Sequence, residues 1–351
     1  MTNNVSTRPL SPNVRENDSQ MKKDYQHQHA AHCETGAISA LLRHHGLPIS
    51  EAMAFGLGAG ITFIHMPWVK VGGLPLTAYR MWPGAIIATL AKQLGIGMVR
   101  HRYRDPAEAM ADLDRHLDAG HVVGLQTSVF WLPYFPAEMR FHFNAHNLLV
   151  YGKDGDDYLI SDPVFEHPVR CPAEALQKAR FAKGVFAPKG LLYYPRQVPE
   201  NYNLQHSLPR ALRKSAFQMC KLPLPFIGTR GIHSLAGQLE KLDHKADPRY
   251  ARLFLGNIVR MQEEIGTGGA GFRFMYASFL QQAAEELGDT ALQAISEEMT
   301  EVGDHWRGFA LSSAGYIRDR QQGGLKAIAA QLEAIATQER AVFEQLWRYA
   351  K

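Results

Sequence analysis

The sequence predicts an α+β domain followed by a helical domain. Three observations carry this prediction: helical spacing of apolar residues early in the chain, short runs of β-branched and aromatic residues between 121 and 194, and helical spacing again beyond 202. Helices that precede a mostly antiparallel sheet are typical of α+β domains. At 351 residues the chain suits two domains, since one domain takes about 150 residues. We expect a flexible polar arm at 1–24, the α+β domain at 25–199 and the helical domain at 200–351.

The α+β domain is expected to open with helices. Residues Cys33–His45 (CETGAISALLRHH) place Ala37, Ile38 and Leu41 at helical spacing, and Gly46 follows as a stop. A cysteine therefore begins the first helix. Further helices are expected from Ser50, over 84–94 and over Pro106–Asp118, the last with Asp105 as its N-cap.

A mostly antiparallel sheet is expected next. The segment HNLLVYGKDGDDYLISDP holds two apolar runs around Lys153–Asp156, which indicates a β-hairpin. β-branched and aromatic residues also predict the other short strands. The expected strands cover Gly97–Tyr103, His121–Val129, Phe143–Gly152, Asp157–Ser161 and Gly190–Tyr194.

The second domain is expected to be a helical bundle or cap that acts as a lid. No internal repeat is evident, which argues against a solenoid. Aromatic residues on its helices, among them Trp306, Phe343 and Trp347, suit either a homodimer or core packing. The expected helices cover Leu208–Cys220, Gly231–Lys245, Pro248–Ile265, Phe272–Glu286, Asp289–Ala314 and Lys326–Tyr349.

The composition excludes several classes of protein. With 46% hydrophobic and 21% charged residues, the chain is neither disordered nor fibrous. No run approaches about 18 apolar residues, so we expect no membrane span. The N-terminus lacks the apolar core of a signal peptide, which indicates a cytoplasmic protein. Three cysteines are too few for a disulfide framework, and we expect Cys171 and Cys220 to be structural.

The net charge of +4 is modest but unevenly distributed. Residues Ala52–Arg104 contain six Lys or Arg and no acidic residue, and Asn201–Leu239 also lacks acidic residues. The second stretch includes Arg210, Arg213 and Lys214. Two interpretations stay open: solvated surface, or a docking face for an acidic protein partner. Nucleic acid is not an expected partner, because neither stretch matches a nucleic-acid-binding module.

Cys33 is the first candidate for a catalytic role. A thiol at a helix N-terminus lies where the helix dipole and free N–H groups favour the thiolate, which is the nucleophilic form. Position alone is weak evidence, because most isolated cysteines are small buried hydrophobic residues. The hypothesis therefore needs a base and an orienting carboxylate elsewhere in the chain.

His146 and Asp162 are the candidates for that pair. They lie at the two ends of the predicted hairpin, symmetric about Asp154. A loop with an odd number of residues would place the two side chains opposite each other, with Cβ atoms about 4.5–5.5 Å apart. An even loop would place Asp162 on the other face. We expect Asp162 to orient His146 as the general base for Cys33. The alternative is that His146 is an ordinary strand histidine and that Asp162 belongs to a turn, neither with a catalytic role.

Side-chain amides before Cys33 are candidates for an oxyanion hole. Gln26 and Gln28 are placed to join the N–H of Cys33 in holding a developing oxyanion, although a polar loop explains them equally well. The histidines of the stretch HQHAAH have no further ligand at a recognised spacing. We therefore expect no metal site and no bound cofactor.

Several motifs together resemble a known family. A helix-borne Cys33, then His146 and, sixteen residues later, Asp162 are similar to the papain-like fold and to the leader-processing cysteine peptidases of bacteriocin ABC transporters. The stretches HCET, LLRHHG, SEAMAFGLGAG and AHNLLVYGKDGDDYLISDP resemble the N-terminal domain of the butirosin biosynthesis protein H family. GTGGAGFRFMYASFLQQAA resembles the helical domain that often follows it. The resemblance covers residues 25–351 and implies a papain-like first domain.

The resemblance implies an acyltransferase of antibiotic or other natural product biosynthesis. Cys33 would take an acyl or aminoacyl group from the phosphopantetheine thioester of an acyl carrier protein or of coenzyme A, and His146, held by Asp162, would help deliver it to an amine. The leader peptidases have a glutamine six positions before the cysteine, where this chain has His27, so the oxyanion donor stays open. A cysteine amidase or peptidase with the same triad, and a non-catalytic scaffold, are the alternatives.

A glycine-rich loop in the second domain is a candidate site for the donor's phosphate. The segment GTGGAGFR places Gly268 and Gly269 before a helix that begins near Phe272, with Arg273 in its first turn. Backbone N–H groups of such a loop can hold the phosphate of phosphopantetheine or coenzyme A. The loop lacks the Lys-Ser/Thr of a nucleotide-binding P-loop. A tight connection between two helices explains the same glycines.

Overall fold

The structure is a computed structural model, and it describes residues 7–9, 25–200, 202–245, 247–318 and 324–350. The chain divides into two compact units, the first formed by Met1–Ala54 and Ile87–Tyr202, the second by Phe55–Ile86 and Asn203–Lys351. The second unit thus includes a segment, 55–86, that interrupts the first unit in sequence. Most of the arm expected at 1–24 lies outside the described residues.

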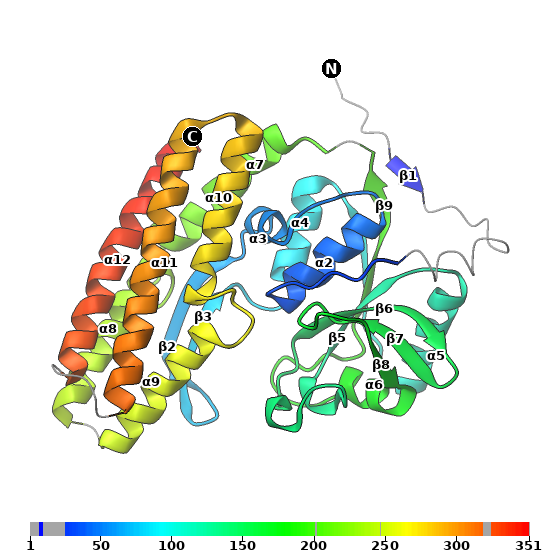
Figure 1. Cartoon of the computed structure of the whole chain (residues 1–351), viewed down its shortest axis with the longest axis horizontal. Coiled ribbons are helices and arrows are strands. Elements are labelled where there is room, and N and C mark those ends of the chain that lie inside the picture. The colour runs from blue at the N-terminus through cyan, green and yellow to red at the C-terminus, as the bar shows by residue number, and fades with distance from the viewer. Residues whose placement is uncertain (1–6, 10–24, 201, 246, 319–323, 351) are drawn as a thin grey trace. The chain divides into compact units, whose positions relative to one another are not determined.

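The first unit is built on a seven-stranded antiparallel sheet (Figure 1). The strand order is β1-β9-β5-β6-β7-β8, and β4 also pairs with β9. The sheet thus places β6, which begins with His146, between β5 and β7. The strands are β1 (Thr7–Pro9), β4 (Gly97–His101), β5 (Val123–Thr127), β6 (His146–Asp154), β7 (Asp157–Ser161), β8 (Val169–Pro172) and β9 (Leu192–Pro199).

Helices pack on this sheet and close its core. The side chain of His32 caps α2, and Asp105 caps α5 by accepting from the N–H of Glu108 at 2.8 Å. The helix α2 contacts β5 and β6, whereas Leu113 of α5 and Leu176 of α6 belong to the buried cluster of the unit. These helices are α2 (Cys33–His44), α5 (Pro106–Asp118) and α6 (Ala173–Arg180), with 3-10 turns at Val129–Trp131 and Ala137–Met139. Two further helices, α3 (Glu51–Leu57) and α4 (Ala85–Leu94), include the points at which the chain passes from one unit to the other.

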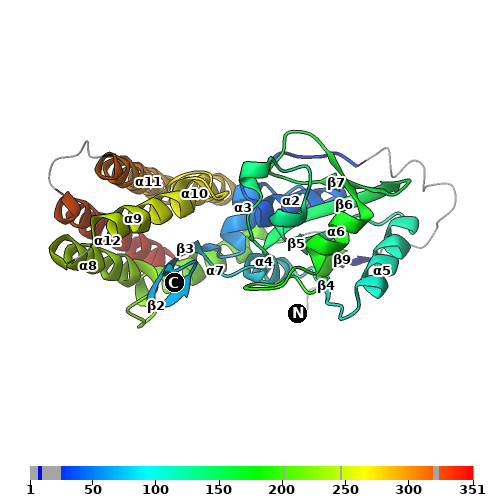
Figure 2. The ribbon, with the colours of Figure 1, turned by 90° about the horizontal axis from the view of Figure 1, so that it is seen from below.

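The second unit is helical apart from one β-hairpin. Its long helices lie side by side (Figure 2), with α12 in contact with α7, α8 and α11. The hairpin packs on α8 and α9. The elements are β2 (Ile61–Val71), β3 (Leu74–Arg80), α7 (Leu204–Ala216), a π turn (Phe217–Lys221), α8 (Gly228–Lys245), α9 (Pro248–Glu263), η4 (Ala270–Phe272), α10 (Arg273–Leu287), α11 (Thr290–Ile317) and α12 (Gly324–Tyr349).

The predicted α+β class is confirmed: an antiparallel sheet with helices, followed by a helical region. The hairpin β2–β3 was not predicted. Trp306 and Phe343 are fully buried, so core packing accounts for both. Among the described residues, no helix is both long and apolar enough to cross a membrane.

Candidate active site

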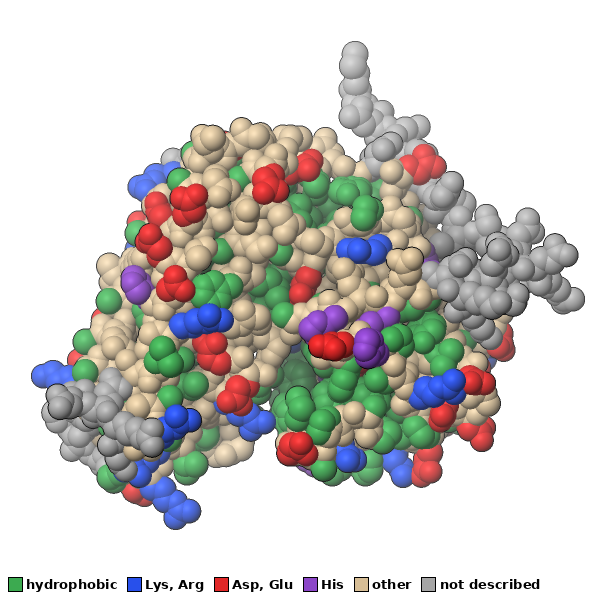
Figure 3. All heavy atoms as spheres, in the orientation of Figure 1, with side chains coloured by type: hydrophobic (Ala, Val, Ile, Leu, Met, Phe, Trp, Pro, Cys, Tyr) green, Lys and Arg blue, Asp and Glu red, His purple; other side chains and the backbone are tan. Residues whose placement is uncertain are grey.

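Cys33 is the first residue of α2, and the turn before it is fixed by the carboxylate of Glu51. This carboxylate accepts hydrogen bonds from the backbone N–H groups of Ala31 (3.0 Å) and His32 (2.7 Å). It also accepts one from the hydroxyl of Thr35 (3.0 Å). The thiol is therefore held at the helix N-terminus, where negative charge is favoured. Figure 3 shows histidine side chains gathered at the surface near this end of α2.

The start of α2 packs closely against the chain that follows β7. The N–H of Ala30 donates to the carbonyl oxygen of Pro163 at 2.7 Å. A Cβ atom at Gly36 would lie 2.5 Å from the Cβ of Ala30 and 2.7 Å from the Cβ of Pro163, so only glycine fits here. This contact ties the segment carrying Cys33 to the residue after Asp162.

His146 and Asp162 form the second half of the site. His146 begins β6, and Asp162 directly follows β7. His146 Nε2 lies 2.6 Å from Asp162 Oδ2, and the two side chains are 4% and 0% exposed. Nε2 faces the carboxylate, so Nδ1 is the other ring nitrogen, and Cys33 is close enough to help raise the pKa of His146. The structure thus brings the three predicted residues together.

The strand register behind this pair differs from the expected one. The loop of the hairpin has two residues, an even number, which by itself would place His146 and Asp162 on opposite faces. A bulge at Tyr151 adds one residue to β6, and beyond it Val150 lies opposite Ile160. His146 lies four residues before Val150, and Asp162 lies two residues after Ile160. Both separations are even and side chains alternate along a strand, so the two side chains lie on the same face of the sheet. The structure therefore corrects the expectation that a loop with an odd number of residues places His146 directly opposite Asp162.

The electrostatics of the site favour a protonated imidazole. Burial lowers the pKa of His146, but the Asp162 carboxylate and Cys33 outweigh burial and raise it to about 10. The carboxylate is also satisfied by two further donors. Oδ2 accepts from the hydroxyl of Tyr134 (2.8 Å) and Oδ1 from the N–H of Val164 (3.2 Å).

The two glutamines expected at the oxyanion hole have different surroundings. Gln26 is exposed, whereas Gln28 is half-buried. The Oε1 atom of Gln28 is buried and has no hydrogen-bond partner among the described residues. The assignment of an oxyanion donor to Gln26 or Gln28 stays a prediction.

His27 has a structural explanation. Its Nε2 lies 2.9 Å from the carbonyl oxygen of Phe165, so the neutral ring carries its proton on Nε2. Its Nδ1 then accepts from the hydroxyl of Ser161 at 2.8 Å. Both ring nitrogens tie the segment before Cys33 to the chain around Asp162.

The glycine-rich loop of the second unit is already occupied by protein groups. The N–H of Gly269 donates to Thr267 Oγ1 (3.1 Å), and the N–H of Ala270 donates to Glu263 Oε1 (3.1 Å). A carboxylate therefore lies where the expected phosphate would have to bind, and like charges repel there. Gly268 is exposed.

Arg273 is fully buried and ion-paired. Its Nη2 and Nε donate to Glu339 Oε1 at 2.7 and 3.0 Å, and its Nη1 donates to the carbonyl oxygen of Gly271 at 2.7 Å. No part of the guanidinium is open to a ligand. The geometry therefore argues against the expected phosphate site at Gly268, Gly269 and Arg273.

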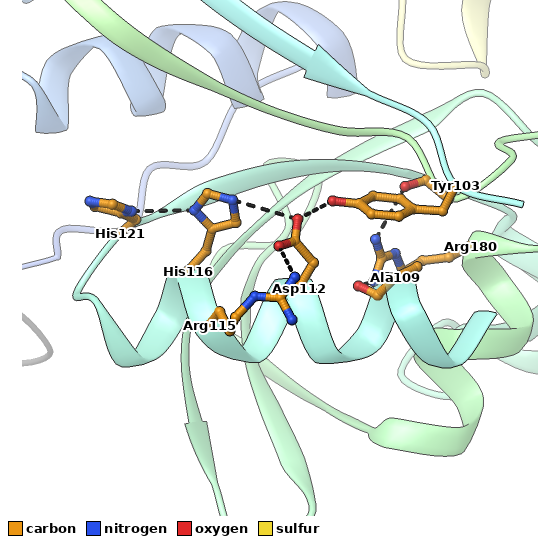
Figure 4. A network of polar contacts seen from close by, with 8 residues as sticks. Tyr103, Ala109, Asp112, Arg115, His116, His121 and Arg180 are labelled. Atoms are coloured by element: carbon orange, nitrogen blue, oxygen red, sulfur yellow. Dashed lines mark hydrogen bonds and ion pairs between the residues drawn. The ribbon is translucent and has the colours of Figure 1, made fainter. Parts of the chain in front are cut away.

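A second polar network lies on α5 in the first unit (Figure 4). Asp112 accepts from the hydroxyl of Tyr103, pairs with Arg115 at 2.5 Å and faces His116 at 3.7 Å. His116 Nδ1 lies 3.3 Å from His121 Nδ1, and burial lowers the pKa of both histidines. Among the residues that the structure describes, no group of three or more His, Cys, Asp or Glu is placed to hold a metal ion.

The other two cysteines are buried free thiols. Burial raises the pKa of Cys171 to about 12 and also raises the pKa of Cys220. Both are therefore protonated at neutral pH and poor nucleophiles. This environment suits the structural role expected for them.

Sequence reasoning missed Glu51 and Tyr134. Glu51 reaches Thr35 across 16 residues, and Tyr134 reaches Asp162 across 28 residues. Such contacts arise from tertiary structure, so local periodicity does not reveal them. The helix-start pattern at Ser50 located Glu51 in sequence but gave no sign of its contact with the turn before Cys33.

Two family models match the chain. Residues 32–163 match the family described as butirosin biosynthesis protein H, N-terminal, and this range includes Cys33, His146 and Asp162. The predicted resemblance is thereby confirmed. Residues 174–346 match a domain of unknown function, DUF4872.

One solved structure is described as a C39-like peptidase from Bacillus anthracis. It is 13% identical to this chain, with a TM-score of 0.33, and the match covers 51% of this chain and 96% of that one. No curated protein matches the chain. The residues that match the butirosin biosynthesis protein H model include a cysteine-bearing helix packed on a histidine-bearing antiparallel sheet.

Proposed function

We propose that this protein is a cysteine-dependent acyltransferase that moves an acyl or aminoacyl group from a thioester to an amine in natural product biosynthesis. The buried pair of His146 and Asp162 beside Cys33, whose thiol lies at a helix N-terminus, carries the proposal. Membership of the first domain in a family of biosynthesis proteins supports the context. The donor is a phosphopantetheine thioester, borne by an acyl carrier protein or by coenzyme A, and the reaction needs no resident cofactor.

In the first half-reaction, Sγ of Cys33 attacks the carbonyl carbon of the thioester. Nδ1 of His146 takes the thiol proton, so the attacking group is a thiolate. The tetrahedral intermediate then collapses, the donor's C–S bond breaks, and the departing sulfur receives the proton from His146. The products are an acyl group on Cys33 and a free phosphopantetheine thiol.

In the second half-reaction, the acceptor amine attacks the acyl carbon. His146 takes a proton from the amine nitrogen and gives it to Sγ of Cys33 as the C–S bond breaks. An amide and the free thiol result. Water in place of the amine would give hydrolysis with the same residues, which is the amidase or peptidase alternative.

Asp162 supports both half-reactions by acting on His146. Its carboxylate holds Nε2 at 2.6 Å, which directs Nδ1 toward the thiol and stabilises the imidazolium that forms twice per cycle. The developing oxyanion is held by the N–H of Cys33, at the first residue of α2, and by the side-chain amide of Gln28.

The proposed carrier-protein docking surface is on α7. Arg210, Arg213 and Lys214 are exposed, and their spacing of three and four residues places them on one face of the helix. An acidic carrier protein complements such a face. Reversal of all three to Glu is expected to slow acylation from a carrier-borne thioester and to remove its salt dependence. Acylation from the coenzyme A thioester should be unchanged; equal rates from the carrier before and after reversal would exclude this surface.

Intact-mass spectrometry tests the proposed nucleophile. The wild-type protein and Cys33→Ala are incubated with a panel of carrier-borne and coenzyme A thioesters, and the mass of the chain is measured. We expect an acyl adduct on the wild-type chain alone, located at Cys33 by peptide mapping. An adduct that persists in Cys33→Ala would contradict the proposal.

A further inference from the structure

Two consecutive residues contact the His146–Asp162 pair from one short segment. Tyr134 and Phe135 lie in the stretch LPYFP, where a proline on either side fixes a backbone φ angle. The hydroxyl of Tyr134 donates to Asp162 Oδ2 at 2.8 Å. The same oxygen accepts from His146 Nε2 at 2.6 Å. One carboxylate atom is thus shared between the imidazole and the tyrosine.

Phe135 contacts the other partner of the pair. Its ring is 5% exposed and stands edge-on to the imidazole of His146, with centroids 5.4 Å apart and planes at 86°. Phe165 packs against both rings, at 5.4 Å from Tyr134 and 4.8 Å from Phe135. The prolines and this packing restrict the segment, so little conformational entropy is lost in keeping the contacts.

We propose that Tyr134 and Phe135 are positioning residues that act on the proposed catalytic reaction through the His146–Asp162 pair. Tyr134 sets how strongly Asp162 holds the imidazolium proton. Phe135 holds the imidazole ring of His146 in its observed orientation. The contacts stand on the geometry alone. Their effect on acyl transfer rests on the proposed function.

The physical basis is competition for one oxygen. Asp162 is fully buried, and among the described residues its carboxylate has three hydrogen-bond donors: Tyr134 and His146 at Oδ2, and the N–H of Val164 at Oδ1 (3.2 Å). A donor on Oδ2 disperses the negative charge and weakens the hold on the imidazolium. Loss of the tyrosine hydroxyl therefore strengthens the bond between the carboxylate and His146.

Few other titratable groups face these residues. Asp162 and Cys33 are the ionisable groups that act on His146, and Asp162 and Cys171 are those that act on Tyr134. Cys171 stays protonated over the working range, because burial raises its pKa to about 12. A change in the titration of His146 in a Tyr134 variant therefore reports the shared oxygen.

The test is the pH dependence of Cys33 alkylation by iodoacetamide in Tyr134→Phe. The rate rises as the pair of Cys33 and His146 loses the proton that it shares, which leaves a thiolate beside a neutral imidazole. We expect this step to move upward by about 0.5–1 pH unit, the size of a lost hydrogen bond to a charged partner. Tyr158→Phe is the matched control, because Tyr158 is also buried in the first unit and donates to a carboxylate, Asp114 Oδ1, at 2.6 Å. The control should keep the wild-type profile.

A second replacement keeps the ring and strengthens the donor. 3,5-Difluorotyrosine at Tyr134 has a more acidic hydroxyl, so the step should move downward, opposite to Tyr134→Phe. A merely structural tyrosine would give no such pair of opposite shifts. Profiles of both replacements that coincide with the wild-type and control profiles overturn the proposal.

NMR titration of the His146 imidazole separates this inference from the proposed function. It is measured in Cys33→Ala with and without Tyr134→Phe, so it needs no reactive thiol. A higher pKa of His146 in the double variant supports the role of Tyr134 even if no acyl-enzyme ever forms. An unchanged or lower pKa overturns it.

Phe135→Leu is expected to lower the alkylation rate without moving the pH step, and a rate equal to that of the wild-type protein excludes the role of Phe135.

Discussion

His146 and Asp162 share one face of the sheet because β6 carries a bulge at Tyr151. Their side chains meet at 2.6 Å although the two residues are not directly opposite in the ladder. In a regular ladder with the same two-residue loop, they would lie on opposite faces. The proposed active site therefore depends on one extra residue in a strand. Bulges are common next to active sites, where they change the direction of a side chain.

The raised pKa of His146 predicts that stability depends on pH. The folded chain holds the imidazolium proton with Asp162, so the pKa of His146 lies above its ordinary value of about 6.5. Above that value the folded state binds more protons than the unfolded state. The stability conferred by the pair is therefore fully present below about pH 6.5 and is lost as the pH rises toward the raised pKa.

Cys33→Ala is the background for this measurement, because it removes the thiol's own titration. We expect its free energy of unfolding to fall with rising pH above about 6.5, with a slope of up to about 1.4 kcal/mol per pH unit for one proton. Adding Asp162→Asn should abolish this fall. Chemical denaturation of the two proteins from about pH 6 to about pH 9 measures it. Parallel curves would show that Asp162 does not hold the proton.

Gly36→Ala is expected to damage both stability and reactivity. The added Cβ would meet Ala30 and Pro163 at 2.5 and 2.7 Å, and such overpacking costs about 1–3 kcal/mol. Because Pro163 adjoins Asp162, alkylation of Cys33 should also slow. Gly237→Ala is the control, since a Cβ in that helix meets nothing within 4 Å and should add stability. Equal melting temperatures for the two variants would refute the close packing.

Arg273→Met is expected to destabilise the second unit by about 3–5 kcal/mol, because it leaves the buried carboxylate of Glu339 without its cation. Arg273→Met with Glu339→Gln should recover most of this loss, since Gln keeps an acceptor for Trp306 Nε1, now 2.9 Å from Glu339 Oε2. Denaturant unfolding compares the three proteins. A stable Arg273→Met protein that binds coenzyme A more weakly would restore the phosphate-site hypothesis.

Local patterns predicted most of the individual elements. Asp105 and Pro106 marked the start of α5, which runs from Pro106 to Asp118 as expected. The hairpin β2–β3 was missed although Gly72 and Gly73 form its turn between two β-rich runs. Register shifts within β2, between Ile61 and Ile64 and between Met66 and Lys70, break the regular alternation that predicts a strand.

Contacts between distant residues limited what the sequence revealed about the site. The sequence predicted one site from Cys33, His146 and Asp162, and the last two lie 2.6 Å apart in the structure. The register argument behind the pair did not hold, because a bulge has no clear local signal at Tyr151. The glycine loop shows the same limit. Its backbone resembles an anion site, but the carboxylate of Glu263, a residue outside the motif, already accepts a hydrogen bond from the N–H of Ala270.

The most direct test of the account is the fate of an acyl group placed on Cys33. The acyl-enzyme is formed with a coenzyme A or carrier-borne thioester, separated from excess donor, and mixed with a panel of primary amines or with buffer alone, and its loss is followed by intact mass. The account predicts discharge that is faster with an amine, saturates with amine concentration and yields the amide. Loss to water at the same rate with or without every amine would contradict it and would make the protein a thiol hydrolase.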